Sequence, residues 1–227
     1  MPSNPNKPSP VDTAREIFAA AFKHHGPRVE ALLWSGETSQ RERFGIMCDI
    51  GDLRDARVLD VGCGFASLYD YLCERFGKIT YTGIDITQEF LSVARERHSG
   101  IDVRLASIDT LGGDERWDYI FCSGIFNLAY GFRDLELNLK HMFERAQTAV
   151  AVNLLSAHSL GALNVEASYF DPADVVTLAA RLSRSFTLRH DYRANDCTLY
   201  LYKRSNYPGR DVTPGNIRAD AVKRPYA

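Results

Sequence analysis

Two acidic residues lie on either side of a glycine turn, and this arrangement is the clearest chemical signal in the sequence. Asp60 ends the run VLD before the turn, Gly62 and Gly64 form the turn, and Asp85 ends the run KITYTGID. Glycine lets a backbone turn sharply and approach a ligand closely. A carboxylate after the second strand can accept hydrogen bonds from ribose hydroxyls. The pattern predicts a nucleotide-type site, unless Asp60 only braces the turn and Asp85 only caps the next helix.

The residues around the turn discriminate between nucleotide ligands. A phosphate-binding loop would need G-K-[ST] after the glycines, and GCGFAS has no lysine there. A dinucleotide turn would place a third glycine where Ser67 stands, and usually no acid before it. An acid at Asp60 suits a ligand with a positive amino-acid end and no pyrophosphate. The turn therefore favours S-adenosylmethionine and disfavours a nicotinamide-dependent oxidoreductase.

Alternating strands and helices must hold these residues in place. Strands are predicted at 57–61, 79–84, 101–105, 117–122 and 147–154, with helices at 65–76, 87–98 and 134–145. A further helix should begin at Asp171 as cap and Pro172, followed by the strands SFTLRH and CTLYLYK. The connection DYRAND is too short for a crossover helix, so the last strand should run antiparallel. The expected fold is α/β, a Rossmann-like doubly wound sheet of seven strands, mostly parallel.

The chain is expected to divide into four parts. Residues 1–10 are rich in proline and asparagine and are predicted to be a disordered tail. Residues 11–56 should form helices that cover the site, the first from Val11 and the second from Ser39, with Glu42 completing a capping box. Residues 57–204 form the ligand-binding domain, and 205–227 a loosely packed C-terminal extension.

Composition limits the partners. The formal net charge of -2 gives no electrostatic reason to expect nucleic acid, and no apolar run reaches the ~20 residues that span a membrane. The five cysteines are odd in number and lack a C-x-x-C pair, which indicates reduced thiols and a cytoplasmic location. No histidines stand at a metal-ligand spacing, so no metal is expected. We expect a monomer or a homodimer.

The motif pair VLDVGCGFA and YTGIDI resembles the first two motifs of class I S-adenosylmethionine-dependent methyltransferases. The resemblance covers residues 57–203 and includes the antiparallel last strand. The segment LLWSGETSQRERFGIMCDIGDL is also similar to the lead-in of a bacterial, small-molecule-type subgroup. The resemblance implies a transferase that uses S-adenosyl-L-methionine, releases S-adenosyl-L-homocysteine and methylates an O or N atom of a small biosynthetic intermediate.

The resemblance also implies which residues contact the cofactor. Gly62, Gly64 and the intervening Cys63 would line its methionine part, and Asp60 would face its amino group. Asp85 would hold the ribose hydroxyls. The remaining candidates are Ile86 at the adenine, Ser107 and Ile108 at the adenine, Ser123 and Gly124 after the fourth strand, and Trp34, Ser39 and Arg43 upstream.

Two of these candidates, Arg43 and Ser107, could form specific polar contacts with the cofactor. Arg43 could pair with the cofactor carboxylate, because a guanidinium matches carboxylate geometry, or it could be an ordinary surface arginine. Ser107 replaces the acid that such enzymes commonly place at the adenine, and Asp109 stands nearby. The adenine amino group would then bond to Ser107 or Asp109.

In methyl transfer the protein mainly orients the cofactor and the acceptor. For an O or N acceptor it also provides a route for the proton that the acceptor loses. Three residues are the catalytic candidates: His158 as general base, Asn127 after the fourth strand, and Tyr169, whose phenol could bind a polar acceptor. Phe126 and Tyr130 could also meet the substrate. The alternative functions are methylation of a protein or RNA, and a non-catalytic module that only binds S-adenosylmethionine.

Overall fold

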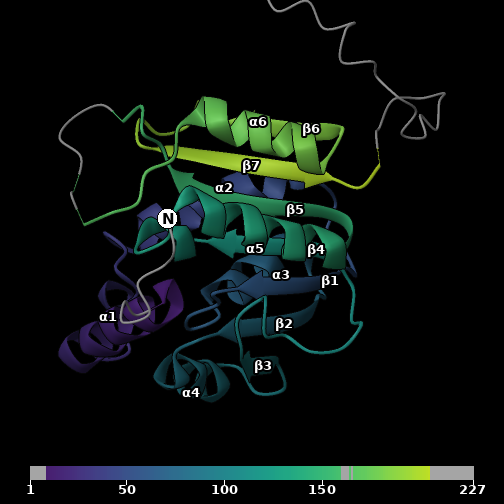
Figure 1. The fold of residues 1–227 in the computed structure, drawn as a ribbon. Helices are drawn as coiled ribbons and strands as arrows, with labels where there is room; N and C mark the ends of the chain where they lie inside the picture. The colour runs from purple at the N-terminus through teal and green to yellow at the C-terminus, as the bar shows by residue number, and fades with distance from the viewer. Residues whose placement is uncertain (1–8, 160–163, 165, 205–227) are drawn as a thin grey trace, which may run out of the picture.

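A seven-stranded sheet runs through the computed structural model, which describes residues 9–159, 164 and 166–204 (Figure 1). The strand order is β3-β2-β1-β4-β5-β7-β6. The strands are β1 (Arg57–Val61), β2 (Thr80–Asp85), β3 (Asp102–Leu105), β4 (Trp117–Ser123), β5 (Ala146–Leu155), β6 (Ser185–Arg189) and β7 (Asp196–Tyr202).

Strand direction confirms the predicted α/β sheet. Strands β1 to β5 pair in parallel, whereas β7 runs antiparallel to both β5 and β6. The chain winds outward from β1 to β3 and then crosses back to β4 on the other side of β1. Ligands of open α/β sheets bind beyond the carboxyl ends of the strands at such a reversal. The site is therefore expected where β1 and β4 end.

Six α-helices accompany the sheet in the described residues: α1 (Pro10–His25), α2 (Glu37–Met47), α3 (Ser67–Phe76), α4 (Gln88–Arg97), α5 (Phe132–Arg145) and α6 (Pro172–Leu182). Short 3-10 turns, η1 (Val29–Leu32), η2 (Cys48–Ile50) and η3 (Ile125–Asn127), connect some of them. Within this part of the chain, no helix combines the length and apolar character that a membrane crossing requires.

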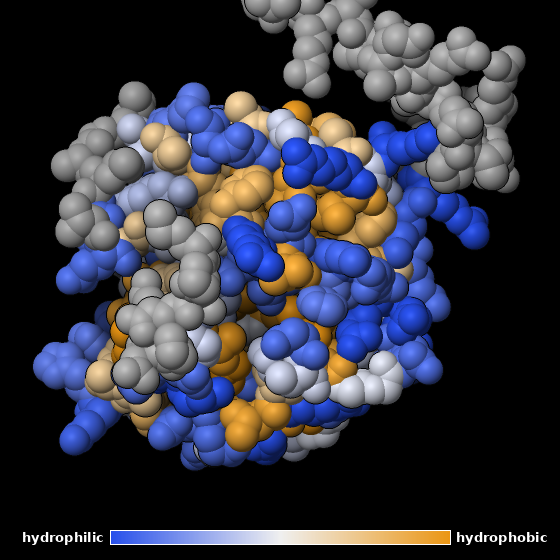
Figure 2. Space-filling view, viewed as in Figure 1, coloured by the Kyte–Doolittle hydropathy of each residue, from blue (hydrophilic) through white to orange (hydrophobic). Residues whose placement is uncertain are grey.

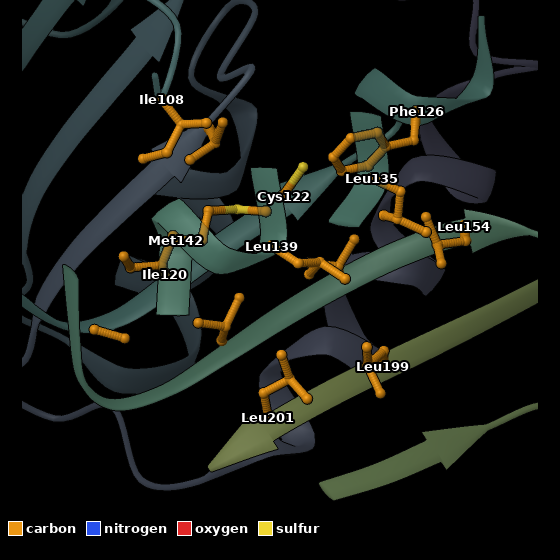
Figure 3. Close-up of a cluster of buried hydrophobic side chains, with 14 of the residues drawn as sticks. Ile108, Ile120, Cys122, Phe126, Leu135, Leu139, Met142, Leu154, Leu199 and Leu201 are labelled. Carbon is orange, nitrogen blue, oxygen red and sulfur yellow. The ribbon is translucent and has the colours of Figure 1, made fainter. Parts of the chain in front are cut away.

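The two faces of the sheet carry different helices, and each face has its own core. On one face α5 and α6 pack through residues such as Leu139 and Leu178. On the other face α2, α3 and α4 pack through residues such as Met47, Leu72 and Leu91. Figure 3 shows side chains of α5 directed at Ile120 and Cys122 of β4 and toward β5 and β7. Burial on both faces accounts for the apolar runs that predicted these strands.

Five helix starts differ from the prediction by one or two residues, and three of them change a cap or a domain boundary. Helix α1 begins at Pro10 with Ser9 as its cap, inside the predicted tail. Helix α2 begins at Glu37 after Gly36, so Ser39 lies in its first turn and the predicted capping box is wrong. Helix α5 begins at Phe132, earlier than predicted, where the Gly131 N–H bonds to the Asp134 carboxylate at 2.8 Å. The rest of the predicted tail and the extension 205–227 lie outside the described residues.

The predicted start of α6 is confirmed. The Asp171 side chain accepts a hydrogen bond from Ala173 N at 2.8 Å, and Pro172 is the first helical residue. This cap satisfies one backbone N–H that the helix itself leaves unpaired.

Candidate active site

The glycine turn after β1 has a backbone that other residues would strain. Gly62 has φ +76° and Gly64 has φ +55°, in the left-handed region that L side chains rarely adopt. A Cβ at Gly62 would overlap the Ile125 side chain, and one at Gly64 would lie 2.9 Å from Leu32 Cδ2. The backbone conformation and the neighbouring side chains therefore both disfavour any residue other than glycine at positions 62 and 64.

Backbone hydrogen bonds fix this turn to the end of β2. The N–H groups of Gly62 and Cys63 both donate to the carbonyl oxygen of Ile84, at 2.8 and 3.0 Å. The next N–H, that of Gly64, donates to Asp85 Oδ2 at 2.9 Å. The turn between β1 and α3 and the end of β2 thus form one rigid unit.

Asp85 connects this unit to the start of α4. Its Oδ1 accepts from Thr87 N at 2.8 Å, while Oδ2 holds Gly64. The side chain is buried, which raises its pKa, and the backbone donors at Gly64 and Thr87 act in the opposite direction. Asp85 thus braces two loops and also lines the cavity described below.

Asp60 lies at the end of β1 and is buried beside Tyr81 of β2. The Tyr81 hydroxyl donates to Asp60 Oδ2 at 2.7 Å. Burial raises the pKa of Asp60 to about 7, against the lowering effect of this hydrogen bond. The group therefore changes charge near neutral pH, in a position where it lines the cavity.

A cavity of about 1060 Å³ opens at the carboxyl ends of the parallel strands, between α1, α2 and α5. This volume lies at the upper end of the roughly 300–1,000 Å³ that is typical of ligand pockets. Figure 2 shows hydrophobic surface in the region between α1 and α5. All residues predicted to contact the cofactor line the cavity: Trp34, Ser39, Arg43, Asp60, Gly62, Cys63, Gly64, Asp85, Ile86, Ser107, Ile108, Ser123 and Gly124.

Arg43 has a partner that the sequence did not suggest. Its Nη2 forms an ion pair with Asp196 Oδ2 at 2.5 Å, and both side chains are buried. Its Nη1 donates to Ser39 O at 2.9 Å and to Ser39 Oγ, and its guanidinium carbon lies 4.9 Å from the centre of the Trp34 ring. Its Nε is buried and has no hydrogen-bond partner within the described residues. The interpretation of Arg43 as a surface arginine is therefore wrong.

Two of the three catalytic candidates line the cavity, and the third does not. Asn127 lies in η3, and its Oδ1 is buried without a hydrogen-bond partner in the part of the chain described. Tyr169 accepts a hydrogen bond from Asn164 N at 3.0 Å. His158 does not line the cavity. Its side chain is 63% exposed, and its Nε2 lies 3.6 Å from Asp171 Oδ2.

Of the two aromatic candidates, one lines the cavity and the other does not. Tyr130 lines the cavity, whereas Phe126 is fully buried in the core under α5 (Figure 3). The expectation that Phe126 meets a substrate is therefore wrong. At the predicted adenine end, Ser107 Oγ lies 2.9 Å from Thr110 Oγ1, and Ile108 and Asp109 also line the cavity.

Helix α5 contributes a face that the sequence analysis missed. Asp134, Leu137, Asn138 and His141 all line the cavity. They recur at the spacing of one helix face, which was the available signal. His141 was not among the candidates, because the local sequence does not show that this face of the helix points to the cavity. Fold and site together define an α/β protein that holds a nucleotide-type ligand where the strand order reverses.

Comparison with known proteins supports this class. The family described as "Methyltransferase domain" matches residues 58–148. The chain is 31% identical over 157 residues to "Putative methyltransferase Rv1506c" of Mycobacterium tuberculosis, an alignment that covers 64% of this chain and 92% of the relative. The chain belongs to the class I S-adenosylmethionine-dependent methyltransferases.

Solved structures agree on the fold. The chain is similar to magnesium protoporphyrin IX methyltransferase of Synechocystis PCC 6803 with bound S-adenosylmethionine, with a TM-score of 0.67, 13% identity, and 88% and 100% of the two chains covered. It is also similar to 1,6-didemethyltoxoflavin-N1-methyltransferase of Burkholderia thailandensis, with a TM-score of 0.63, 18% identity, and 90% and 95% covered. At these identities the likeness concerns the fold.

Proposed function

We propose that this methyltransferase transfers the methyl group of S-adenosylmethionine to an O or N atom of a small molecule. The observation that carries the proposal is the cavity of about 1060 Å³, which extends from the glycine turn to Asn127 and Tyr169. Its volume lies at the upper end of the range for small-molecule pockets, and residues of α1 and α5 form part of its lining. A pocket of this kind suits a small acceptor better than a segment of protein or RNA. The net charge of -2 also gives no support to an RNA substrate.

The residues present fit the cofactor. Gly62 and Gly64 place no side chain at the turn, and Asp85 retains unused lone pairs that can accept from ribose hydroxyls. Asp60 and Ile108 also line the cavity; Asp60 would face the amino group, and Ile108 would contact the adenine. When bound, S-adenosylmethionine supplies a methyl group on a good leaving group.

The acceptor end would then orient a nucleophile toward that methyl group. Asn127 lines the cavity, and its buried Oδ1 has no donor among the described residues, so we assign its side-chain amide to hydrogen-bond an acceptor hydroxyl or amine. Tyr169 and Tyr130 would border the same space. Holding two reactants in line is the largest contribution that such a site can make.

Transfer of a radioactive methyl group tests the proposal. The purified protein is incubated with S-adenosylmethionine that carries a tritiated methyl group. Separate reactions contain a library of small alcohols, phenols and amines, total protein, or total RNA as the acceptor. We expect label in a small molecule, and loss of that label in the Asn127→Ala variant. Label only in protein or RNA would contradict the proposal. Cofactor binding with no label anywhere would favour a non-catalytic binding module.

A further inference from the structure

Part of the cavity lining is apolar and open to solvent. Leu33 is 48% exposed, Leu137 47% and Ile17 37%, and all three line the cavity. They are half of the large hydrophobic side chains that are exposed in the described residues. They come from α1, the loop after η1, and α5, which are separate in the sequence. Exposed hydrophobic side chains that gather around one cavity mark a surface that a ligand covers.

Acidic side chains outnumber basic ones on the lining of the cavity. Asp109, Asp134 and Glu166 line the cavity in addition to Asp60 and Asp85. Among the described lining residues, Arg43 is the only lysine or arginine. Its guanidinium is already paired with Asp196. His141 is the one other base on the described lining.

This charge balance discriminates between classes of acceptor. An anion placed in a partly closed apolar cavity loses hydration and must regain the energy from a positive partner. Here it would meet carboxylates, and like charges raise its cost further. An uncharged molecule has no such cost and gains from covering Leu33, Leu137 and Ile17.

We propose that the acceptor is a mainly apolar molecule that carries a hydroxyl or amine and no negative charge, and that the site discriminates against carboxylates, sulfonates and phosphates. This inference rests on the proposed function and specifies the substrate class of the same site. Asn127 receives the polar atom, and the walls from α1 and α5 receive the apolar body.

Two fluorescent probes with the same skeleton test the inference. N-phenyl-1-naphthylamine is neutral, and 1-anilinonaphthalene-8-sulfonate is the same molecule with a sulfonate. Each is titrated at pH 8 into protein saturated with sinefungin, a cofactor analogue that keeps a positive group in place of the sulfonium. We expect the neutral probe to bind about tenfold tighter or more. Equal or tighter binding of the sulfonate, or no binding of either probe, would overturn the inference.

Charge variants show whether the difference arises in this cavity. Leu137→Arg adds a cation at an exposed position on the wall and should strengthen sulfonate binding about tenfold. Val176→Arg is the matched control, because Val176 is 38% exposed on α6 and does not line the cavity. Glu166→Gln, at another exposed position, should act in the same direction as Leu137→Arg. Sulfonate binding that neither Leu137→Arg nor Glu166→Gln changes would contradict the inference.

Failure of the inference is distinguishable from failure of the proposed function. Binding of sinefungin is measured first by calorimetry. Absence of that binding would contradict the proposed function. Normal sinefungin binding together with a preference for the sulfonate would contradict only the substrate class.

Discussion

Arg43 of α2 and Asp196 at the start of β7 form a buried ion pair, with Nη2 and Oδ2 2.5 Å apart. This pair joins helix α2 to strand β7, which lies between β5 and β6, beside the cavity that Arg43 lines. The Trp34 ring covers the guanidinium and also lies against Gly124, where an added Cβ would be 3.1 Å from it. The pair thus fixes one wall of the site to the sheet.

Removal of one partner of this pair should be costly. Asp196→Ala leaves a buried guanidinium without a counter-charge, and we expect a loss of about 3–5 kcal/mol in the free energy of unfolding, measured by denaturant titration. The double change Arg43→Met with Asp196→Leu should recover most of that stability, because no charge remains buried. Asp52→Ala, which breaks the exposed pair with Arg54, is the control and should change little. Equal effects of Asp196→Ala and Asp52→Ala would contradict this account.

Asp60 should make cofactor binding depend on pH near neutrality. Burial raises its pKa to about 7, so the carboxyl group is protonated below that pH and charged above it. Only the charged form attracts an ammonium group, so the dissociation constant for S-adenosylhomocysteine should rise about tenfold between pH 8 and pH 6. For the same reason, this group's contribution to stability without ligand is largest at low pH and is lost as the pH rises through 7.

Calorimetric titrations at pH 6, 7 and 8 measure this effect. Asp60→Asn should bind weakly, with little change between these pH values. Glu74→Gln on α3, at an exposed residue outside the cavity, should follow the wild-type pH dependence. A pH-independent wild type would show that Asp60 does not face the amino group.

Gly62 should tolerate alanine far less than another glycine with a similar backbone. Gly62→Ala combines positive φ with overlap against Ile125, so we expect loss of S-adenosylhomocysteine binding and a clearly lower melting temperature. Gly100→Ala is the control, because Gly100 has φ +90° and nothing within 4 Å of an added Cβ. Its cost should be only the backbone strain, about 1–2 kcal/mol. Adding Ile125→Ala to Gly62→Ala should restore part of the stability, and equal behaviour of the two single variants would refute the steric explanation.

Once an acceptor is known, substitutions of the catalytic candidates His158 and Asn127 should have different effects on kcat/KM. His158→Ala should keep kcat/KM close to the wild-type value, because His158 is exposed beside Asp171 and outside the cavity. Asn127→Ala should lower kcat/KM roughly ten- to hundredfold through loss of a buried hydrogen bond to the acceptor. Initial rates at saturating cofactor measure both. A severe loss in His158→Ala with an intact Asn127→Ala would reverse the assignment.

Features that depend on neighbouring residues could be predicted from the sequence. The glycine turn, the two acids and the cap at Asp171 are local patterns, and the short DYRAND connection was enough to predict an antiparallel β7. Rotation of α5 was not predictable, because the packing of Leu139 and Met142 against the sheet turns His141 toward the cavity.

Long-range contacts were outside the reach of local patterns. The partner of Arg43 is Asp196, which is far from it in the sequence, and no spacing rule connects the two residues. His158 was misplaced because the path of its loop depends on pairing between Ser156 and Phe170. Residue types therefore indicated the cofactor end of the site well and the acceptor end poorly.

Calorimetric titration of S-adenosylhomocysteine into the wild type and the Asp85→Ala variant tests the central claim most directly. The account predicts one site per chain in the wild type, and an affinity roughly five- to 150-fold weaker in the variant, corresponding to ~1–3 kcal/mol for a lost buried hydrogen-bonding group. Asp102→Ala on β3, an exposed acid outside the cavity, should bind like the wild type. No binding by the wild type, or unchanged affinity in Asp85→Ala, would contradict the account.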